Sequence, residues 1–331
     1  MLRPVVVVVA SVAVVGLAAC EASPAEGEGE GEGEGEGEGE GEGEGEGEPI
    51  SARFVAVGYG GRRLTSSDGA AWSNDVAVVD NGGDDDNLLR GACAHDGVFL
   101  AVGGSAHGVV RRSIDGGVSW TTTVEDERGW IGACAFDDDG IVTFVGSARS
   151  ARSFDGGVTI VDLATHFYAG GNWEMRDVIV VDGVFVAVGD LGVSTSDDGA
   201  VWTEPAGPRD LFRIASGNGH SVAVGAGVHA HSTDLTTWTS TSRTGLGDVV
   251  FADGRFLIVG EGFGLTSSDG VAFVEHAQPA MSRVAVGVVD GGSVYVGVNY
   301  PDVRRISSDG LTWSEPARDD RNAIDDVIFA R

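Results

Sequence analysis

From residue 51 onward the chain consists of short apolar runs separated by turns rich in Gly, Asp and Ser. One recurring run is rich in β-branched and aromatic residues and ends in Val-Gly, as in 54–58, 99–103, 185–189 and 256–260. Continuous apolar runs of this length, bounded by turn residues, are typical of buried strands. No segment shows the period of an amphipathic helix of useful length, so we expect an all-β domain.

A second apolar run precedes the Val-Gly run, and Asp-Gly joins the two in 178–183 and 249–254. Asp-Gly between apolar runs favours a tight hairpin. A third strand then leads into a turn of the form Ser-x-Asp, usually followed by Gly and an aromatic residue that begins a fourth strand. Its aspartates are Asp68, Asp115, Asp155, Asp198, Asp234, Asp269 and Asp309. Four antiparallel strands repeated about every 40 residues predict the blade of a β-propeller.

The two ends of the repeat complement each other. The first copy, from Ser51, begins at the second strand of a blade, and the final segment 324–329 is a first strand with nothing after it. We therefore predict a seven-bladed β-propeller of four-stranded antiparallel blades over 51–331. The C-terminal strand would complete the first blade and close the ring, which leaves no open edge between the termini.

The Ser-x-Asp phrase resembles the Asp-box, or BNR, repeat of sialidases, related exo-glycosidases, sortilin-like domains and photosystem assembly-factor propellers. The resemblance covers essentially all of 51–331. It implies a structural turn between the third and fourth strands, tied by the Ser and the Asp, with the aromatic residue packed between blades. Two copies depart from the pattern, because Ile160 replaces the aromatic residue after Asp155 and Leu235 replaces the Gly after Asp234.

The N-terminus has the organisation of an export signal. Arg3 precedes an uncharged apolar run over 5–17, which is too short for a comfortable membrane span and suits a signal peptide. The run ends in Leu-Ala-Ala-Cys at 17–20, which resembles the lipobox of bacterial lipoproteins. That resemblance implies removal of 1–19 and lipidation of Cys20. An ordinary signal peptide with a chance cysteine is the alternative. We expect an exported lipoprotein anchored in the outer membrane, facing the periplasm or the surface.

Residues 26–48 alternate strictly between Glu and Gly, with 12 Glu and 11 Gly. Such a segment repels itself and buries no apolar surface, so 20–50 is expected to be a disordered, extended tether. The chain carries a net charge of −30, of which 51–331 contribute −18 through 20 Arg and 38 acidic residues. A surface this acidic argues against nucleic-acid binding. The chain has no lysine, which excludes Schiff-base chemistry on a lysine.

Candidate ligand-binding residues gather where blades begin. The arginines are Arg90, Arg176, Arg213 and Arg283, and the aromatic residues in connections between blades are Trp130, Tyr168 and Trp173. We expect the arginines near the mouth of the central channel, where clustered guanidinium groups suit a carboxylate. Pairing with the domain's own acidic residues is the alternative for the arginines. Capping of blade edges is the alternative for the aromatic residues.

The leading functional hypothesis is a non-catalytic, lipid-anchored, monomeric scaffold for a protein or glycan ligand, with no cofactor. The alternative is a sialidase-like exo-glycosidase that uses the arginine cluster. That chemistry needs a Tyr nucleophile activated by Glu, and no motif selects any of the four tyrosines. His229 and His231 could form a metal pair, but no third ligand is evident, so no metal is expected. Cys93 and Cys134 lie in similar Gly-Ala-Cys-Ala segments, which suggests matching positions in adjacent blades, and we expect two buried free thiols.

Overall fold

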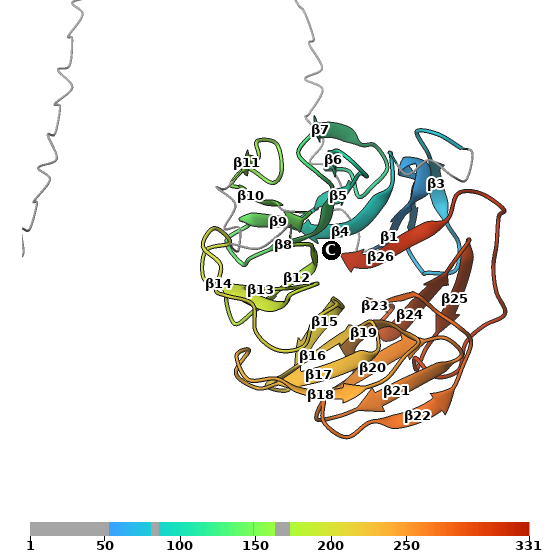
Figure 1. Cartoon of the computed structure of the whole chain (residues 1–331). Coiled ribbons are helices and arrows are strands. Elements are labelled where there is room, and N and C mark those ends of the chain that lie inside the picture. The colour runs from blue at the N-terminus through green and yellow to red at the C-terminus, as the bar shows by residue number, and fades with distance from the viewer. Residues whose placement is uncertain (1–52, 81–85, 148, 163–172, 331) are drawn as a thin grey trace, which may run out of the picture. The chain divides into compact units, whose positions relative to one another are not determined.

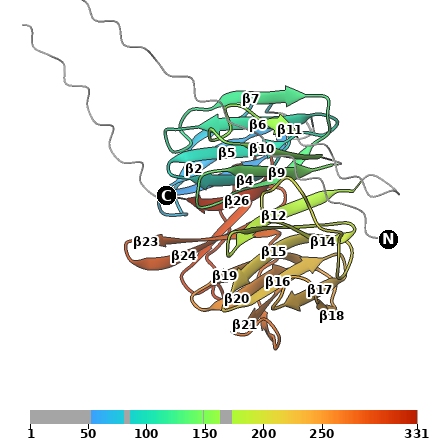
Figure 2. The same cartoon turned by 90° about the vertical axis from the view of Figure 1, so that its left-hand side faces the viewer.

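The computed structural model describes residues 53–80, 86–147, 149–162 and 173–330. Seven antiparallel sheets surround a common axis, which confirms the all-β, seven-bladed propeller (Figure 1). In the view from the side, the outer strands β7 and β18 lie at opposite margins of the ring (Figure 2). Within the described ranges no helix has the length and apolar character needed to cross a membrane. The helical element in these ranges is the short 3-10 turn η1 (Tyr59–Gly61).

The blades are numbered in chain order, and within each blade the strands run from the innermost to the outermost. Blade 1 is β26 (Ile324–Ala330), β1 (Arg53–Gly58), β2 (Arg63–Ser66) and β3 (Ser73–Val76). Blade 2 is β4 (Leu89–His95), β5 (Val98–Gly103), β6 (Gly108–Ser113) and β7 (Thr121–Asp126). Blade 3 is β8 (Ile131–Phe136), β9 (Val142–Gly146), β10 (Arg149–Ser153) and β11 (Val161–Asp162).

Blade 4 is β12 (Met175–Val181), β13 (Val184–Gly189) and β14 (Gly192–Ser196). Blade 5 is β15 (Leu211–Gly217), β16 (His220–Gly225), β17 (Val228–Ser232) and β18 (Thr239–Ser242). Blade 6 is β19 (Leu246–Ala252), β20 (Arg255–Gly260), β21 (Phe263–Ser267) and β22 (Val274–Ala277). Blade 7 is β23 (Arg283–Val289), β24 (Gly292–Asn299) and β25 (Val303–Ser307).

The predicted closure of the ring is confirmed, because β26 pairs antiparallel with β1 and supplies the innermost strand of blade 1. The expectation of four strands in every blade is wrong for blades 4 and 7, which have three regular strands within the described residues. In place of the fourth strand each has a single bridge, at Ala206 and at Ala317. Pro205 and Pro316 directly precede these bridges, and proline has no N–H to donate to a regular ladder.

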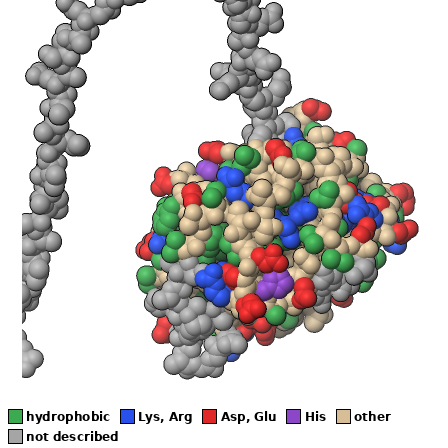
Figure 3. Space-filling model, turned by 90° about the horizontal axis from the view of Figure 1, so that it is seen from above, with side chains coloured by type: hydrophobic (Ala, Val, Ile, Leu, Met, Phe, Trp, Pro, Cys, Tyr) green, Lys and Arg blue, Asp and Glu red, His purple; other side chains and the backbone are tan. Residues whose placement is uncertain are grey.

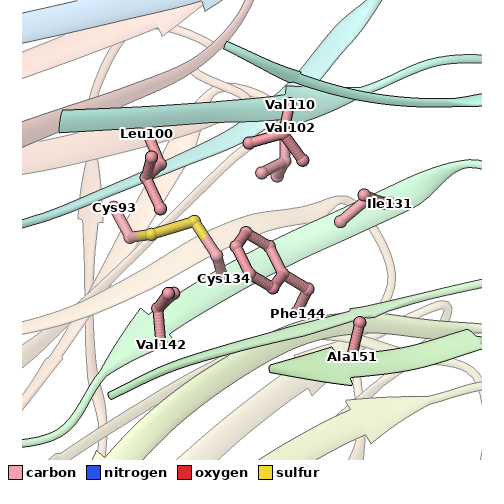
Figure 4. Close-up of a cluster of buried hydrophobic side chains, with 9 residues drawn as sticks. All are labelled: Cys93, Leu100, Val102, Val110, Ile131, Cys134, Val142, Phe144 and Ala151. Carbon is pink, nitrogen blue, oxygen red and sulfur yellow. A yellow bond between two sulfur atoms is a disulfide. The ribbon is translucent and has the colours of Figure 1, made fainter. Parts of the chain in front are cut away.

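The apolar runs are buried between blades. Seven core clusters are present in the described residues, one at each seam between neighbouring blades. Figure 4 shows the cluster at the seam of blades 2 and 3, in which Leu100 and Val102 face Ile131 and Phe144. Burial of such side chains, each stabilising by about 1.5–3 kcal/mol, joins each blade to the next.

The glycine that ends each Val-Gly run is required because a side chain there would overlap the backbone. A Cβ at Gly103 would overlap the carbonyl oxygen of Leu88, which lies just before the innermost strand of the same blade. The same overlap with a backbone carbonyl would occur at Gly58, Gly146, Gly189, Gly225 and Gly260. Beside each of these glycines the innermost strand carries a β-bulge, which lets one extra residue project out of register.

The expectation of two free thiols is wrong, because Cys93 and Cys134 form a disulfide with their Cα atoms 5.7 Å apart (Figure 4). The similar Gly-Ala-Cys-Ala segments are not in matching register. Cys93 pairs with Leu100, three residues before the glycine of β5, whereas Cys134 pairs with Phe144, two residues before the glycine of β9. A shift of one residue turns a side chain to the opposite face of a strand. The two thiols therefore face each other across the seam.

A buried ionic cluster holds the connection between β25 and β26 against blade 1. Arg62, which is fully buried, donates Nε and Nη2 to the two carboxylate oxygens of Asp75, at 3.0 and 2.8 Å. It also contacts Asp302 at 3.1 Å and donates to Asp319 and to the carbonyl oxygen of Asn322, both at 2.5 Å. One guanidinium thus links blade 1, blade 7 and the closing segment.

Candidate axial anion site

A cavity of about 530 Å³ opens at the axis, at the end of the ring where the innermost strands begin. Its lining residues are Arg90, Trp130, Gly132, Glu174, Arg176, Phe212, Arg213, Leu246, Gly247, Ser282, Arg283 and Asp325. All four candidate arginines therefore reach one cavity, together with Trp130. We call this space the axial arginine cavity. In the space-filling view from above, which faces the rim of the ring, basic and acidic side chains lie interspersed across the surface (Figure 3).

The bulges explain which residues reach the cavity. In six blades the residue left unpaired by the bulge lines it: Asp325, Arg90, Gly132, Arg176, Phe212 and Gly247. In blade 7 the innermost strand pairs in regular register, and its paired residue Arg283 lines the cavity instead. A bulge re-aims a side chain that regular alternation would direct elsewhere. The β-bulges in the innermost strands of six blades therefore determine which residues line the axial arginine cavity.

The arginines are held mainly by backbone carbonyls. Arg90 donates Nε to the carbonyl oxygen of Gly104 at 2.8 Å, and its guanidinium lies 4.9 Å from the ring centroid of Trp130. Arg283 donates to the carbonyl oxygen of Ser282 at 2.7 Å. Arg176 donates to Glu174 at 3.2 Å, in a pair that is substantially exposed on both sides. Within the described residues, the Nε atoms of Arg176 and Arg283 are buried without a hydrogen-bond partner.

Arg213 also reaches a deeper cavity. It follows the bulge in β15 and pairs with Val224, so it lies one level below Arg90 and Arg176. The deeper cavity, of about 200 Å³, is lined by Arg213 and by Asp177, Asp248 and Asp326 among others. Arg213 Nε lies 3.9 Å from Asp248. The axis therefore carries an upper level rich in arginine and a lower level rich in aspartate.

The three lower aspartates link blades. The carboxylate of Asp177 accepts the N–H of Ile214 at 3.0 Å, and that of Asp248 accepts the N–H of Val284 at 3.0 Å. The carboxylate of Asp326 accepts the N–H of Ala92 at 3.1 Å. Each aspartate occupies the same register position in its blade and bonds to the innermost strand of the next blade. Charged acceptors make strong bonds of this kind, so these three seams are fastened near the axis.

Burial raises the pKa of the lower aspartates, although Arg213 opposes the effect. The pKa rises to about 6 for Asp177 and to about 7 for Asp326, and it is raised for Asp248 also. Burial lowers the pKa of Arg283, and the nearby positive charge of Arg213 lowers it further. For Arg213 the surrounding carboxylates outweigh burial and raise the pKa. The lower level can therefore lose negative charge at mildly acidic pH.

The aromatic candidates do not all share the cavity. Trp130 lines it, whereas Trp173 is buried in the core cluster between blades 3 and 4. Tyr168 lies outside the described residues. Sequence reasoning did not select Glu174, Phe212 or the lower aspartates. A signal was present for the latter, because Asp-Val recurs at 177–178, 248–249 and 326–327 near the start of first strands.

The seven Ser-x-Asp turns lie at the end of the blades away from the cavity, since antiparallel strands place alternate connections at opposite ends. In every turn the Ser hydroxyl donates to the Asp carboxylate. Asp309 also accepts the N–H groups of Leu311 and Thr312, both at 2.8 Å. These backbone donors lower the pKa of Asp309 to about 2. Leu235 adopts φ 61°, close to the 67–76° of the glycines at 69, 199, 270 and 310, so the turn at Asp234 keeps its form.

Within the described residues, the axial arginine cavity brings together neither a Tyr–Glu pair nor a group of metal ligands. The cavity lining contains Glu174 but no tyrosine from the described ranges. The ring of His229 packs edge-on against Phe273 with centroids 5.1 Å apart, and burial lowers the pKa of His229. No group of three His, Cys, Asp or Glu side chains that could hold a metal ion occurs in the described part of the chain.

No protein-family model matches the chain, and no curated protein matches it. Solved structures do match in fold. One, titled "YCF48 bound to D1 peptide", has a TM-score of 0.51 at 15% identity and covers 68% of this chain and 77% of its own. The Nidogen/Laminin complex gives a TM-score of 0.51 at 10% identity, with coverage of 85% and 98%. The WD40 propeller domain of Doa1 gives 0.54 at 14% identity, with coverage of 74% and 87%. These likenesses support the propeller fold.

Proposed function

We propose that this protein is a non-catalytic binding module that holds an anionic group of a ligand in the axial arginine cavity. The observation that carries the proposal is the convergence of four arginines on one cavity. Clustered guanidinium groups suit a carboxylate or another planar anion.

The ligand is proposed to be a protein. Two of the structurally similar propellers were solved with a protein or peptide partner, a D1 peptide for YCF48 and laminin for nidogen. Trp130, Phe212 and Leu246 add apolar surface to the cavity lining, as a side chain beside the anionic group would require. A glycan ligand is the second candidate.

We further propose that the module carries Asp-box repeats and is attached to an envelope membrane through Cys20 and the tether 20–50. The lipobox-like segment and the Glu-Gly tract support the attachment. The hydrogen-bonded Ser-x-Asp turns support the repeat. Replacing Cys20→Ala is expected to move the protein from the membrane fraction to the soluble fraction. Unchanged fractionation would contradict the lipid anchor.

The binding proposal is tested with citrate, a small tricarboxylate, by calorimetry at pH 8 and constant ionic strength. We expect saturable binding with one site and a loss of about tenfold in affinity for Arg176→Gln, because a hydrogen bond to a charged group contributes about 1.5–3 kcal/mol. The matched control is Arg305→Gln, since Arg305 lies on the outer strand β25 and bonds to the carbonyl oxygen of Ser314. Equal binding by both variants would show that citrate does not use the cavity.

A further inference from the structure

The seam between blades 2 and 3 is crossed by two unusual contacts. Near the cavity, the guanidinium of Arg90 from blade 2 stacks on Trp130, which immediately precedes β8 of blade 3. Further along the same two strands, the Cys93–Cys134 disulfide joins β4 to β8 (Figure 4). Arg90 lies three residues before Cys93, and Trp130 lies four residues before Cys134. The covalent link therefore sits directly below a contact that forms part of the cavity wall.

Within the described residues, the seam between blades 2 and 3 has no aspartate that bonds to the backbone of the next blade, as found at three other seams. At the seams after blades 1, 4 and 6, a lower aspartate accepts a hydrogen bond from an N–H of the innermost strand of the next blade. In blade 2 the same register position, opposite a valine of the second strand, is Gly91. A Cβ there would lie 2.8 Å from the carbonyl oxygen of Gly132, so no side chain fits. The disulfide, two residues further along β4, supplies a link where a carboxylate has no room.

We propose that the Cys93–Cys134 disulfide is a positioning element of the axial arginine cavity, which keeps Arg90 stacked on Trp130 and thereby keeps it oriented for an anion. This inference rests on the proposed function of the cavity. Arg90 is otherwise held through the carbonyl oxygen of Gly104, which belongs to its own blade. Without the disulfide, Arg90 would stay with blade 2, and its distance from Trp130 would depend on side-chain packing between β4 and β8 alone.

The restraint from the disulfide reaches the cavity wall through the buried core of the seam between blades 2 and 3. Cys93 and Cys134 are both buried, at 9% and 6% exposure, within a cluster that contains Leu100 and Phe144. Replacement of both cysteines by alanine keeps this cluster apolar but removes the covalent restraint. A site loosened by a fraction of an ångström binds less well because its groups no longer meet the ligand together. The disulfide thus acts through the Arg90–Trp130 pair and not by contact with the ligand.

The test is a double-mutant cycle on the full chain with citrate as the probe at pH 8. Cys93→Ala/Cys134→Ala is expected to weaken citrate binding by about two- to fivefold, the factor equivalent to one cation–π contact. Trp130→Ala is expected to weaken it similarly. The combination of both changes is expected to give little further loss, because the disulfide acts through the stack. Fully additive losses would overturn the proposal.

A control variant at the end of the blades away from the cavity distinguishes an effect on stability from an effect on citrate affinity. Tyr295→Phe removes the hydrogen bond from the Tyr295 hydroxyl to Asp253, at 2.6 Å, across the seam of blades 6 and 7. This variant is expected to unfold at a lower temperature with unchanged citrate affinity. If Tyr295→Phe weakens citrate binding as much as loss of the disulfide does, the effect is one of general stability and the positioning role is wrong.

Should the double cysteine variant fail to fold, the same comparison is made on the wild-type protein reduced with a phosphine, after alkylation has shown that thiols 93 and 134 are free. Reduced protein that is folded and binds citrate as tightly as the oxidised form overturns the inference and leaves the proposed function intact. No citrate binding by the oxidised wild type overturns both. Weaker binding by the reduced form, restored on reoxidation, supports the positioning role.

Discussion

Arg62→Met provides the sharpest test of how the ring is closed. The substitution keeps an apolar stem of similar length and removes the guanidinium that joins Asp75, Asp302, Asp319 and the Asn322 carbonyl. Asp75 and Asp319 are 21% and 31% exposed and can be rehydrated, whereas Asp302 is 3% exposed. Asp302 would keep the N–H of Asp319 at 3.0 Å and, as its remaining cationic partner, Arg304, whose Nε is 3.7 Å away. Removing one partner of a buried ion pair lowers the free energy of unfolding by about 3–5 kcal/mol.

Because part of the cluster can rehydrate, we expect the lower end of that range, about 3 kcal/mol in the free energy of unfolding. For a domain of this size that corresponds to a fall of roughly 5 °C in Tm. The assay is thermal and urea unfolding followed by circular dichroism at pH 8. The matched control is Arg321→Ala, which removes a partner of the same Asp75 but is itself 29% exposed, so its cost should stay below about 1 kcal/mol. A loss for Arg62→Met no larger than that of the control would show that the buried guanidinium does not hold the closing segment in place.

Three further outcomes are expected. Gly103→Ala places a Cβ against the Leu88 carbonyl oxygen and should lower the free energy of unfolding by about 1–3 kcal/mol, measured by urea unfolding. Asp309→Ala removes two backbone hydrogen bonds and should cost about 1 kcal/mol, with Asp309→Asn closer to wild type in the same assay. Sulfate, whose charge is constant from pH 8 to 5, should bind several-fold more tightly at pH 5. The reason is that Asp326 and Asp177, with pKa values of about 7 and 6, become neutral and release Arg213 and Arg283. An unchanged affinity across this range, or an equal rise in Asp326→Asn, would contradict the last prediction.

The same raised pKa values affect stability in a defined direction. The folded state of Asp326 and Asp177 binds a proton more tightly than the unfolded chain, whose aspartates have a pKa near 3.9. Their ionisation therefore lowers the free energy of unfolding as pH rises through about 4 to 7. Asp269 and Asp309 act oppositely, because their pKa values are lowered to about 2 and their stabilisation is lost as pH falls below about 4.

The fold followed from the sequence because each blade repeats its own local signals. The Val-Gly phrase marks a glycine that must lie against a backbone carbonyl, and the Ser-x-Asp phrase marks a turn that bonds to its own backbone. Both contacts lie within one blade and recur from blade to blade, so a period in the sequence reports them directly. The missing regular fourth strands of blades 4 and 7 were also marked in the sequence, by Pro205 and Pro316.

The site was predicted less completely because its composition depends on register. Arg90 and Arg176 occupy bulge positions, whereas Arg213 lies one residue later and one level deeper. Sequence spacing alone does not locate a bulge, so the two levels at the axis were not distinguished. The same uncertainty of one residue in register led to the wrong prediction of free thiols at Cys93 and Cys134, which form a disulfide. Trp173 was selected by its place between blades, but its burial in the core depends on contacts with two neighbouring sheets.

The closing strand has a mechanical consequence. Because β1 lies between β26 and β2, any pull transmitted through the residues before Arg53 enters the domain at a strand bonded on both sides. The load would have to break two ladders together, one of which contains the last residues of the described chain. The same arrangement leaves blade 1 without its innermost strand until those last residues have been synthesised. The blade that would take such a load is therefore also the blade whose pairing forms last during synthesis.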